Sequence, residues 1–104
     1  MGEADGVILL PLTRHQEGKF AATGAATQIA NPPLTGRVAI RLFISGATAG
    51  QSVVVAHNAA TCTINGGYEI AVGEKLDLEL PVSAQIWTRK KGGSPTLCWA
   101  EFAP

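Results

Sequence analysis

The sequence predicts an all-β fold: a single-domain antiparallel β-sandwich or jelly-roll-like barrel with an extended N-terminal arm. Three observations lead to this prediction. Short segments alternate between apolar and polar residues, turn residues separate them every 8–12 positions, and no segment makes a convincing helix. The clearest alternation spans residues 75–80, where Leu76, Leu78 and Leu80 share one face and carboxylates occupy the other. This period of two is the pattern of a half-buried strand.

The remaining strands follow from alternation and from the turn residues between them. Asn31-Pro32-Pro33 blocks both a helix and a central strand, so a new strand begins after it. Asn65-Gly66 is a strong turn dipeptide, and residues 90–95 are expected to form a hairpin loop between the last two strands. The strands expected are residues 27–30, 37–44, 52–56, 61–64, 68–72, 75–80, 84–89 and 96–102.

The chain of 104 residues is expected to form one domain, with an arm over residues 1–24 and a sandwich over residues 25–104. The arm has weak periodicity and is rich in Gly, Ala and Thr, so it has too little apolar area to order by itself. We therefore expect it to order against a partner. Its apolar residues are the candidate docking residues, and with Pro11 they would make at most a short edge strand. They are Val7, Ile8, Leu9 and Leu10.

Charge is scarce: 15% of the residues are charged and the formal net charge is zero, against a usual charged fraction of about 25%. This balance argues against binding to nucleic acid or to an anionic membrane, both of which require a basic surface. It is typical of a surface partly covered by a partner, or of an ordinary surface rich in small residues. The one cluster of charge is Arg89, Lys90 and Lys91, which would contact a partner or form a solvated hairpin tip.

No stretch approaches the roughly 18 apolar residues of a membrane span. The apolar run at residues 7–10 ends at Pro11 with no basic segment before it, so we expect no signal peptide and synthesis in a cytoplasm. Cys62 and Cys98 lie in alternating segments and are expected to be free, buried thiols, with a disulfide as the alternative.

No catalytic, cofactor or metal motif is recognised. His15 and His57 lie in presumed loops without the cysteines or carboxylates that a metal site would need. The carboxylates of residues 77 and 79 are better explained as the solvent side of their strand than as a catalytic pair. Trp87 and Trp99 would stack on sugars, pack together, or divide between the core and an interface. We therefore expect no enzymatic activity, no cofactor and no metal.

Several turn and strand signals follow one another in a fixed order over residues 26–102. They are Thr27-Gln28-Ile29-Ala30, Pro33-Leu34-Thr35-Gly36-Arg37, the apolar strand 38–44, Gly66-Gly67-Tyr68, Gly73-Glu74 leading into residues 76–80, Ile86-Trp87, and residues 97–102. This order resembles a group of small structural proteins of tailed bacteriophages. The chain departs from that group at Ala71 and in the Cys and Trp content of its last strand.

The resemblance implies a non-enzymatic virion protein on the capsid surface. Such a capsid decoration, or cement, protein would stabilise the phage head by binding across major capsid protein subunits, as a homo-oligomer such as a trimer. The alternative is a β-module of a tail or fibre that binds surface glycans or other virion proteins. A third hypothesis is a small cupin-like enzyme, but the sequence lacks the His-rich metal motif that this would require.

Overall fold

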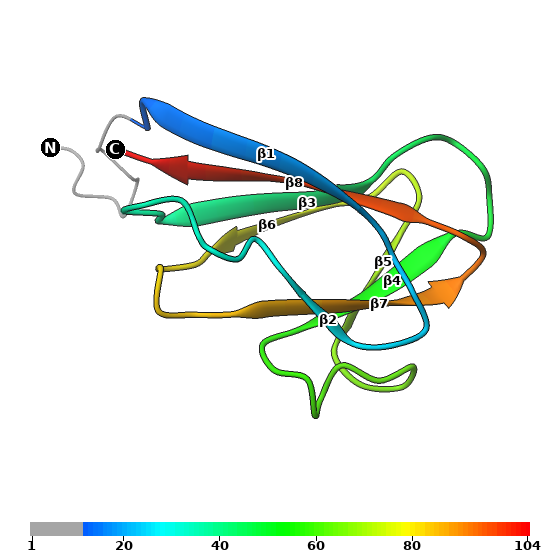
Figure 1. Ribbon diagram of the computed structural model, residues 1–104. Helices are drawn as coiled ribbons and strands as arrows, with labels where there is room; N and C mark the ends of the chain where they lie inside the picture. Colours follow the sequence, from blue (N-terminus) through cyan, green and yellow to red (C-terminus); the bar gives the residue numbers. More distant parts are fainter. Residues whose placement is uncertain (1–11) are drawn as a thin grey trace, which may run out of the picture.

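The structure is a computed structural model that describes residues 12–104. Two antiparallel four-stranded sheets face each other, and the predicted all-β sandwich is confirmed (Figure 1). The first sheet has the order β1 (Arg14–Ala21), β8 (Thr96–Ala103), β3 (Ala39–Ile44), β6 (Lys75–Glu79). The second has the order β2 (Thr27–Ile29), β7 (Ile86–Gly92), β4 (Ser52–Ala56), β5 (Tyr68–Ala71).

The connections between strands make this sandwich a jelly roll. Only β4 and β5 are consecutive strands of one sheet, and every other connection crosses from one sheet to the other. The sheet orders 1-8-3-6 and 2-7-4-5 are those of an eight-stranded jelly roll. The predicted hairpin between the last two strands is therefore wrong. Residues 93–95 link the two sheets, because β8 pairs with β1 on one side and with β3 on the other.

The first of these partners, β1, was not predicted as a strand. Residues 14–21 were assigned to the arm, but they pair with β8 without interruption, from Arg14 opposite Ala103 to Ala21 opposite Thr96. Their side chains are mostly exposed, and only Phe20 packs against the core cluster. The strand is therefore ordered by main-chain pairing with β8 rather than by an apolar face, which explains why its sequence shows no alternation. The candidate docking residues Val7, Ile8, Leu9 and Leu10 lie outside the described residues.

The core lies between the sheets and is built from alternate residues of each strand. Leu42 of β3, Val53 of β4 and Leu97 of β8 are fully buried there. Three leucines of the predicted alternating segment pack against this cluster, so their predicted face is confirmed. They are only half-buried, because β6 is an edge strand that pairs with β3 alone. They are Leu76, Leu78 and Leu80.

The central strand β4 is buried on both faces, which accounts for its run of valines. Val53 and Val55 belong to the core cluster, while Val54 faces the other way and is covered by residues 57–67. Residues 61–64 were predicted as a strand but belong to this covering loop, where the Thr61 N–H donates to Asn58 Oδ1 at 2.8 Å. Gly67, with φ of 78°, ends the loop so close to β4 that a Cβ would lie 2.5 Å from the Val55 carbonyl oxygen.

One end of the interior is polar. Arg37 and Glu101 are 2% and 0% exposed, and Arg37 Nη1 donates to Glu101 Oε2 at 2.9 Å. The guanidinium also donates to the carbonyl oxygens of Leu80, Pro81 and Ala84, and Glu101 accepts from the Leu34 N–H and from Gln16 Nε2. This ion pair therefore joins β1, β8 and the two loops before β3 and after β6.

Candidate interaction surfaces

The face of the first sheet that points away from the second sheet, here called the outer face, has small side chains on its two central strands. Ala39 on β3 and Cys98 and Ala100 on β8 project little above the sheet. Two hollows of about 370 and 340 Å³ form there. The first is lined by Leu12, Ala39, Ile40, Arg41, Asp77, Leu78, Glu79 and Phe102, and the second by Glu17, Gly18, Lys19, Phe43, Cys98, Trp99 and Ala100.

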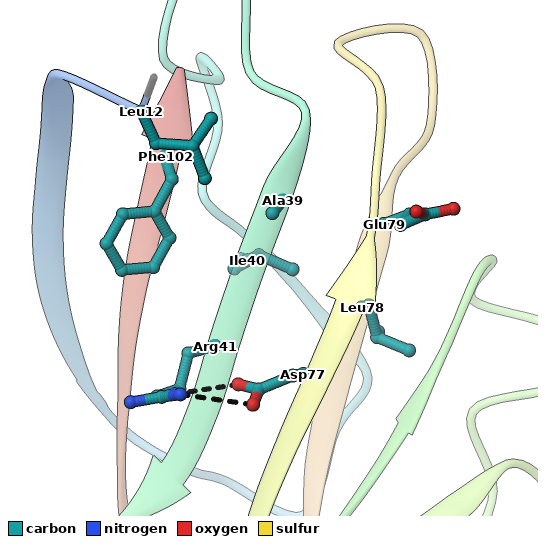
Figure 2. A pocket seen from close by; sticks show the side chains of 8 residues that line it. All are labelled: Leu12, Ala39, Ile40, Arg41, Asp77, Leu78, Glu79 and Phe102. Carbon is teal, nitrogen blue, oxygen red and sulfur yellow. Dashed lines mark hydrogen bonds and ion pairs between the residues drawn. The ribbon is translucent and has the colours of Figure 1, made fainter. Parts of the chain in front are cut away.

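Apolar groups stand beside these hollows. Figure 2 shows Phe102 of β8 next to Leu12, with β3 and β6 forming the other side of the first hollow. Leu12 is 39% exposed, and Phe43, beside the second hollow, is 37% exposed. The outer face thus combines exposed apolar side chains with two depressions.

Charged groups of both signs lie on the outer face, and Arg41 and Asp77 among them form a direct ion pair. Arg41 holds Asp77 through two hydrogen bonds, Nε to Oδ1 at 2.7 Å and Nη2 to Oδ2 at 3.1 Å (Figure 2). The hydrogen bond from Arg41 is the main cause that lowers the pKa of Asp77, and the same pair raises the pKa of Arg41. Both side chains are largely exposed. A partner of this face would therefore meet a nearly neutral surface.

A third cavity, of about 310 Å³, opens between the sheets beside β6. Leu76 and Leu78 of β6 and Leu80 just after it form one wall, and Val55 and Ile86 of the second sheet contribute to the other. The polar side chains around it are His57, Tyr68 and Gln85. This opening explains why the three leucines are not fully buried.

The predicted cation cluster is divided by the fold. Arg89, Lys90 and Lys91 belong to β7 and not to a hairpin tip, and consecutive strand residues point to opposite faces. Arg89 is half-buried beside Val54, whereas Lys91 donates to Glu69 at 2.9 Å. The hydrogen bond from Lys91 is the main cause that lowers the pKa of Glu69. The three residues therefore do not form one basic patch.

The histidines, cysteines and tryptophans are also separated. His15 lies on β1, and His57 follows β4 in the other sheet. Cys62 and Cys98 are free and buried, as predicted. Burial raises the pKa of the Cys62 thiol, while the charge of Arg89 lowers it in part.

The two tryptophans lie in different sheets, so they do not stack on each other across a hairpin. Trp99 packs against the core cluster, which matches the alternative of one tryptophan in the core. Trp87 is half-buried in the second sheet, and its indole N–H donates to Gln85 at 2.9 Å. Both tryptophans are half-buried, and Trp99 also lines the second hollow.

Within residues 12–104 no group of three or more histidine, cysteine or acidic residues is placed to hold a metal ion. In the same part of the chain no helix is long and apolar enough to cross a membrane. No family model matches the chain, and neither a curated protein nor a solved structure matches it.

Proposed function

We propose that this protein is a non-enzymatic structural protein of a tailed-phage virion, a capsid decoration protein that binds across major capsid protein subunits through its outer face. The observation that carries this proposal is the outer face itself. It joins two hollows, exposed Phe43 and Leu12, and charges of both signs on a rigid four-stranded sheet. Such a face suits a broad contact with another protein surface. The resemblance of residues 26–102 to phage structural proteins supports the choice of partner.

The fold is compatible with this proposal but does not select it. Jelly rolls include viral capsid domains, lectins and cupins, and a fold by itself does not determine function. The decoration role is favoured over the others because two hollows and the exposed side chains of Leu12 and Phe43 lie together on one sheet face that carries charges of both signs.

The experiment is to mix the purified protein with head shells of the phage that encodes it and to measure the bound copies by co-sedimentation and electron cryomicroscopy. Binding should saturate at a copy number set by the lattice. A Phe43→Ser variant should bind at least about tenfold more weakly, since it removes an apolar contact from the outer face. Tyr68→Ser is the matched control, because Tyr68 is exposed but lies on β5 of the other sheet. Absence of saturable binding, or equal binding by the Phe43 variant, would contradict the proposal.

Glycan binding by a tail or fibre module is the second candidate, and one observation favours it. Trp87 is held in one orientation by Gln85 and stays partly accessible, as a sugar-stacking residue must be. Titration with host surface glycans should then change the fluorescence of Trp87, and Trp87→Ala should abolish the change. Trp99 serves as the internal reference, since it packs against the core.

A further inference from the structure

The edge strand β1 has one neighbour among the described residues, and its free side can be identified residue by residue. The Ala22 N–H donates to the Pro95 carbonyl oxygen at 3.0 Å, which continues the β1–β8 register by one pair. The main-chain N–H and C=O groups of successive residues point to opposite sides of a strand. The even-numbered residues of β1 therefore form hydrogen bonds with β8. On the other side of β8, the Ser45 N–H donates to Thr96, so the even residues of β8 bond β3 and its odd ones bond β1.

The main-chain groups of His15, Glu17, Lys19 and Ala21 therefore point away from the sheet. An edge of this kind is a template for another strand, and proteins usually block it with a proline, a bulge or charged side chains such as lysine. β1 contains no proline, its register with β8 is continuous over all eight residues, and its Lys19 is accompanied by Glu17 of opposite charge. Its side chains on the outer face are well exposed, at 61% for His15 and 73% for Glu17.

We propose that β1 pairs antiparallel with β1 of a second copy, in the register that places Gly18 opposite Gly18 and Glu17 opposite Lys19. The two first sheets then form one continuous eight-stranded sheet about a two-fold axis. Glu17 and Lys19 of β1 have opposite charges, so a second copy of β1 is complementary to this edge. The same two charges also favour one register over the others.

Three two-fold symmetric registers keep most of β1 paired. In them residue 17, 18 or 19 lies opposite the same residue of the second copy. The first sets two Glu17 carboxylates against each other, and the last sets two Lys19 ammonium groups against each other. The middle register instead forms two Glu17–Lys19 pairs, on the same outer face and directly opposite. In all three, the outward-pointing odd residues face odd residues, and each hydrogen-bonded pair exchanges two main-chain bonds.

The centre of the proposed pairing also suits glycine. The ring of Trp99 lies where a side chain of residue 18 would be, so close that a Cβ on Gly18 would be 2.2 Å from the ring. Residues that face each other without exchanging hydrogen bonds approach to about 4.5 Å between Cα atoms. Because Gly18 has no side chain, the two β1 strands can approach this closely while Trp99 of each copy keeps its position over its own Gly18.

The test measures the self-association of the full chain by sedimentation velocity over a concentration series. The wild type should dimerise, and Glu17→Lys and Lys19→Glu should each weaken the dimer by roughly tenfold or more, since each converts two attractive pairs into two repulsive ones. The double variant Glu17→Lys/Lys19→Glu should restore it. Lys75→Glu on the opposite edge strand is the matched control and should leave the dimer unchanged.

The register is tested separately by cross-linking. Residues 15 and 21 of two copies would be about 5.5 Å apart between Cα atoms, which a disulfide spans. His15→Cys/Ala21→Cys should therefore form a covalent dimer under mild oxidation, and His15→Cys alone should not. A wild type that stays monomeric at all concentrations, a dimer insensitive to both single charge reversals, or cross-linking by His15→Cys alone would overturn the proposal.

Discussion

The interior of the sandwich has an apolar centre and a polar end, and the two regions depend on their residues in different ways. In the centre, Leu42, Val53 and Leu97 are fully buried and belong to one apolar cluster. At the polar end, Arg37 and Glu101 are buried to a similar extent but hold β1, β8 and two loops together through directional bonds. Apolar packing tolerates exchange of similar volumes, whereas a buried ion pair fails when either partner is lost. The comparison predicts a ranking of variants.

The largest effect is expected at the polar end. Arg37→Met should lower the free energy of unfolding by about 3–5 kcal/mol, because Glu101 is left as a buried charge without its partner. Chemical denaturation gives the measurement, and Arg41→Met is the control, since its pair with Asp77 is solvent-exposed and screened. The double variant Arg37→Met/Glu101→Leu should be more stable than Arg37→Met. A cost no greater than that of the control would show that the pair is not essential.

In the apolar centre, Leu42→Ala should cost about 2–5 kcal/mol through lost burial and a residual cavity. Leu78→Ala is the matched comparison on the neighbouring strand. It should cost roughly half as much, because Leu78 lies beside an open cavity and already contacts solvent. The two denaturation curves decide the matter, and equal losses would mean that β6 is as well covered as β3.

A single polar atom inside the apolar centre gives a smaller, opposite effect. Thr88 is 0% exposed, and its hydroxyl makes no hydrogen bond with any described residue. Thr88→Val keeps the shape and removes the unpaired group, so stability should rise by about 1 kcal/mol. Thermal and chemical unfolding should agree on the sign. Thr27→Val on the neighbouring strand β2 is the control, because the Thr27 hydroxyl does donate a hydrogen bond, to the Ala25 carbonyl oxygen. A loss of stability would indicate that the hydroxyl has a partner.

The smallest effect concerns the exposed ion pairs, which contrast with the buried one. The pKa of Asp77 and that of Glu69 are lowered in the folded protein by their hydrogen bonds from Arg41 and Lys91. A carboxyl group whose pKa is lowered by folding stabilises the fold at any pH above its ordinary pKa, which is about 3.9 for Asp. This stabilisation is lost as the pH falls through the lower pKa of the folded protein. Melting temperatures of the wild type and Asp77→Asn should thus differ slightly at pH 7 and converge as the pH falls below the ordinary pKa of an aspartate. A constant difference would contradict this.

The apolar centre was predictable from the sequence because apolar and polar residues alternate along most of the strands. The strands from β2 to β8 were located within a few residues, except that residues 61–64 form a covering loop. The polar end was not predicted, although a signal was present. Glu101 follows Leu97 and Trp99 at every second position of its strand, so its side chain points inward with theirs, where an acidic residue needs a buried partner. β1 left no such signal, because its order comes from main-chain bonds that any side chains allow. The candidate surfaces depend on which strands become neighbours, and short-range patterns do not specify that.

The pairing of β1 with β8 also sets the order in which the chain can fold. Arg14 meets Ala103, so the partners in this pair are among the most distant in the chain. A nascent chain must therefore hold β1 unpaired until β8 has been synthesised, and closing so long a loop delays the gain from pairing. We expect the first sheet to be completed last and after translation, with β4 and β5, the one pair of consecutive strands in a single sheet, providing the earliest local structure.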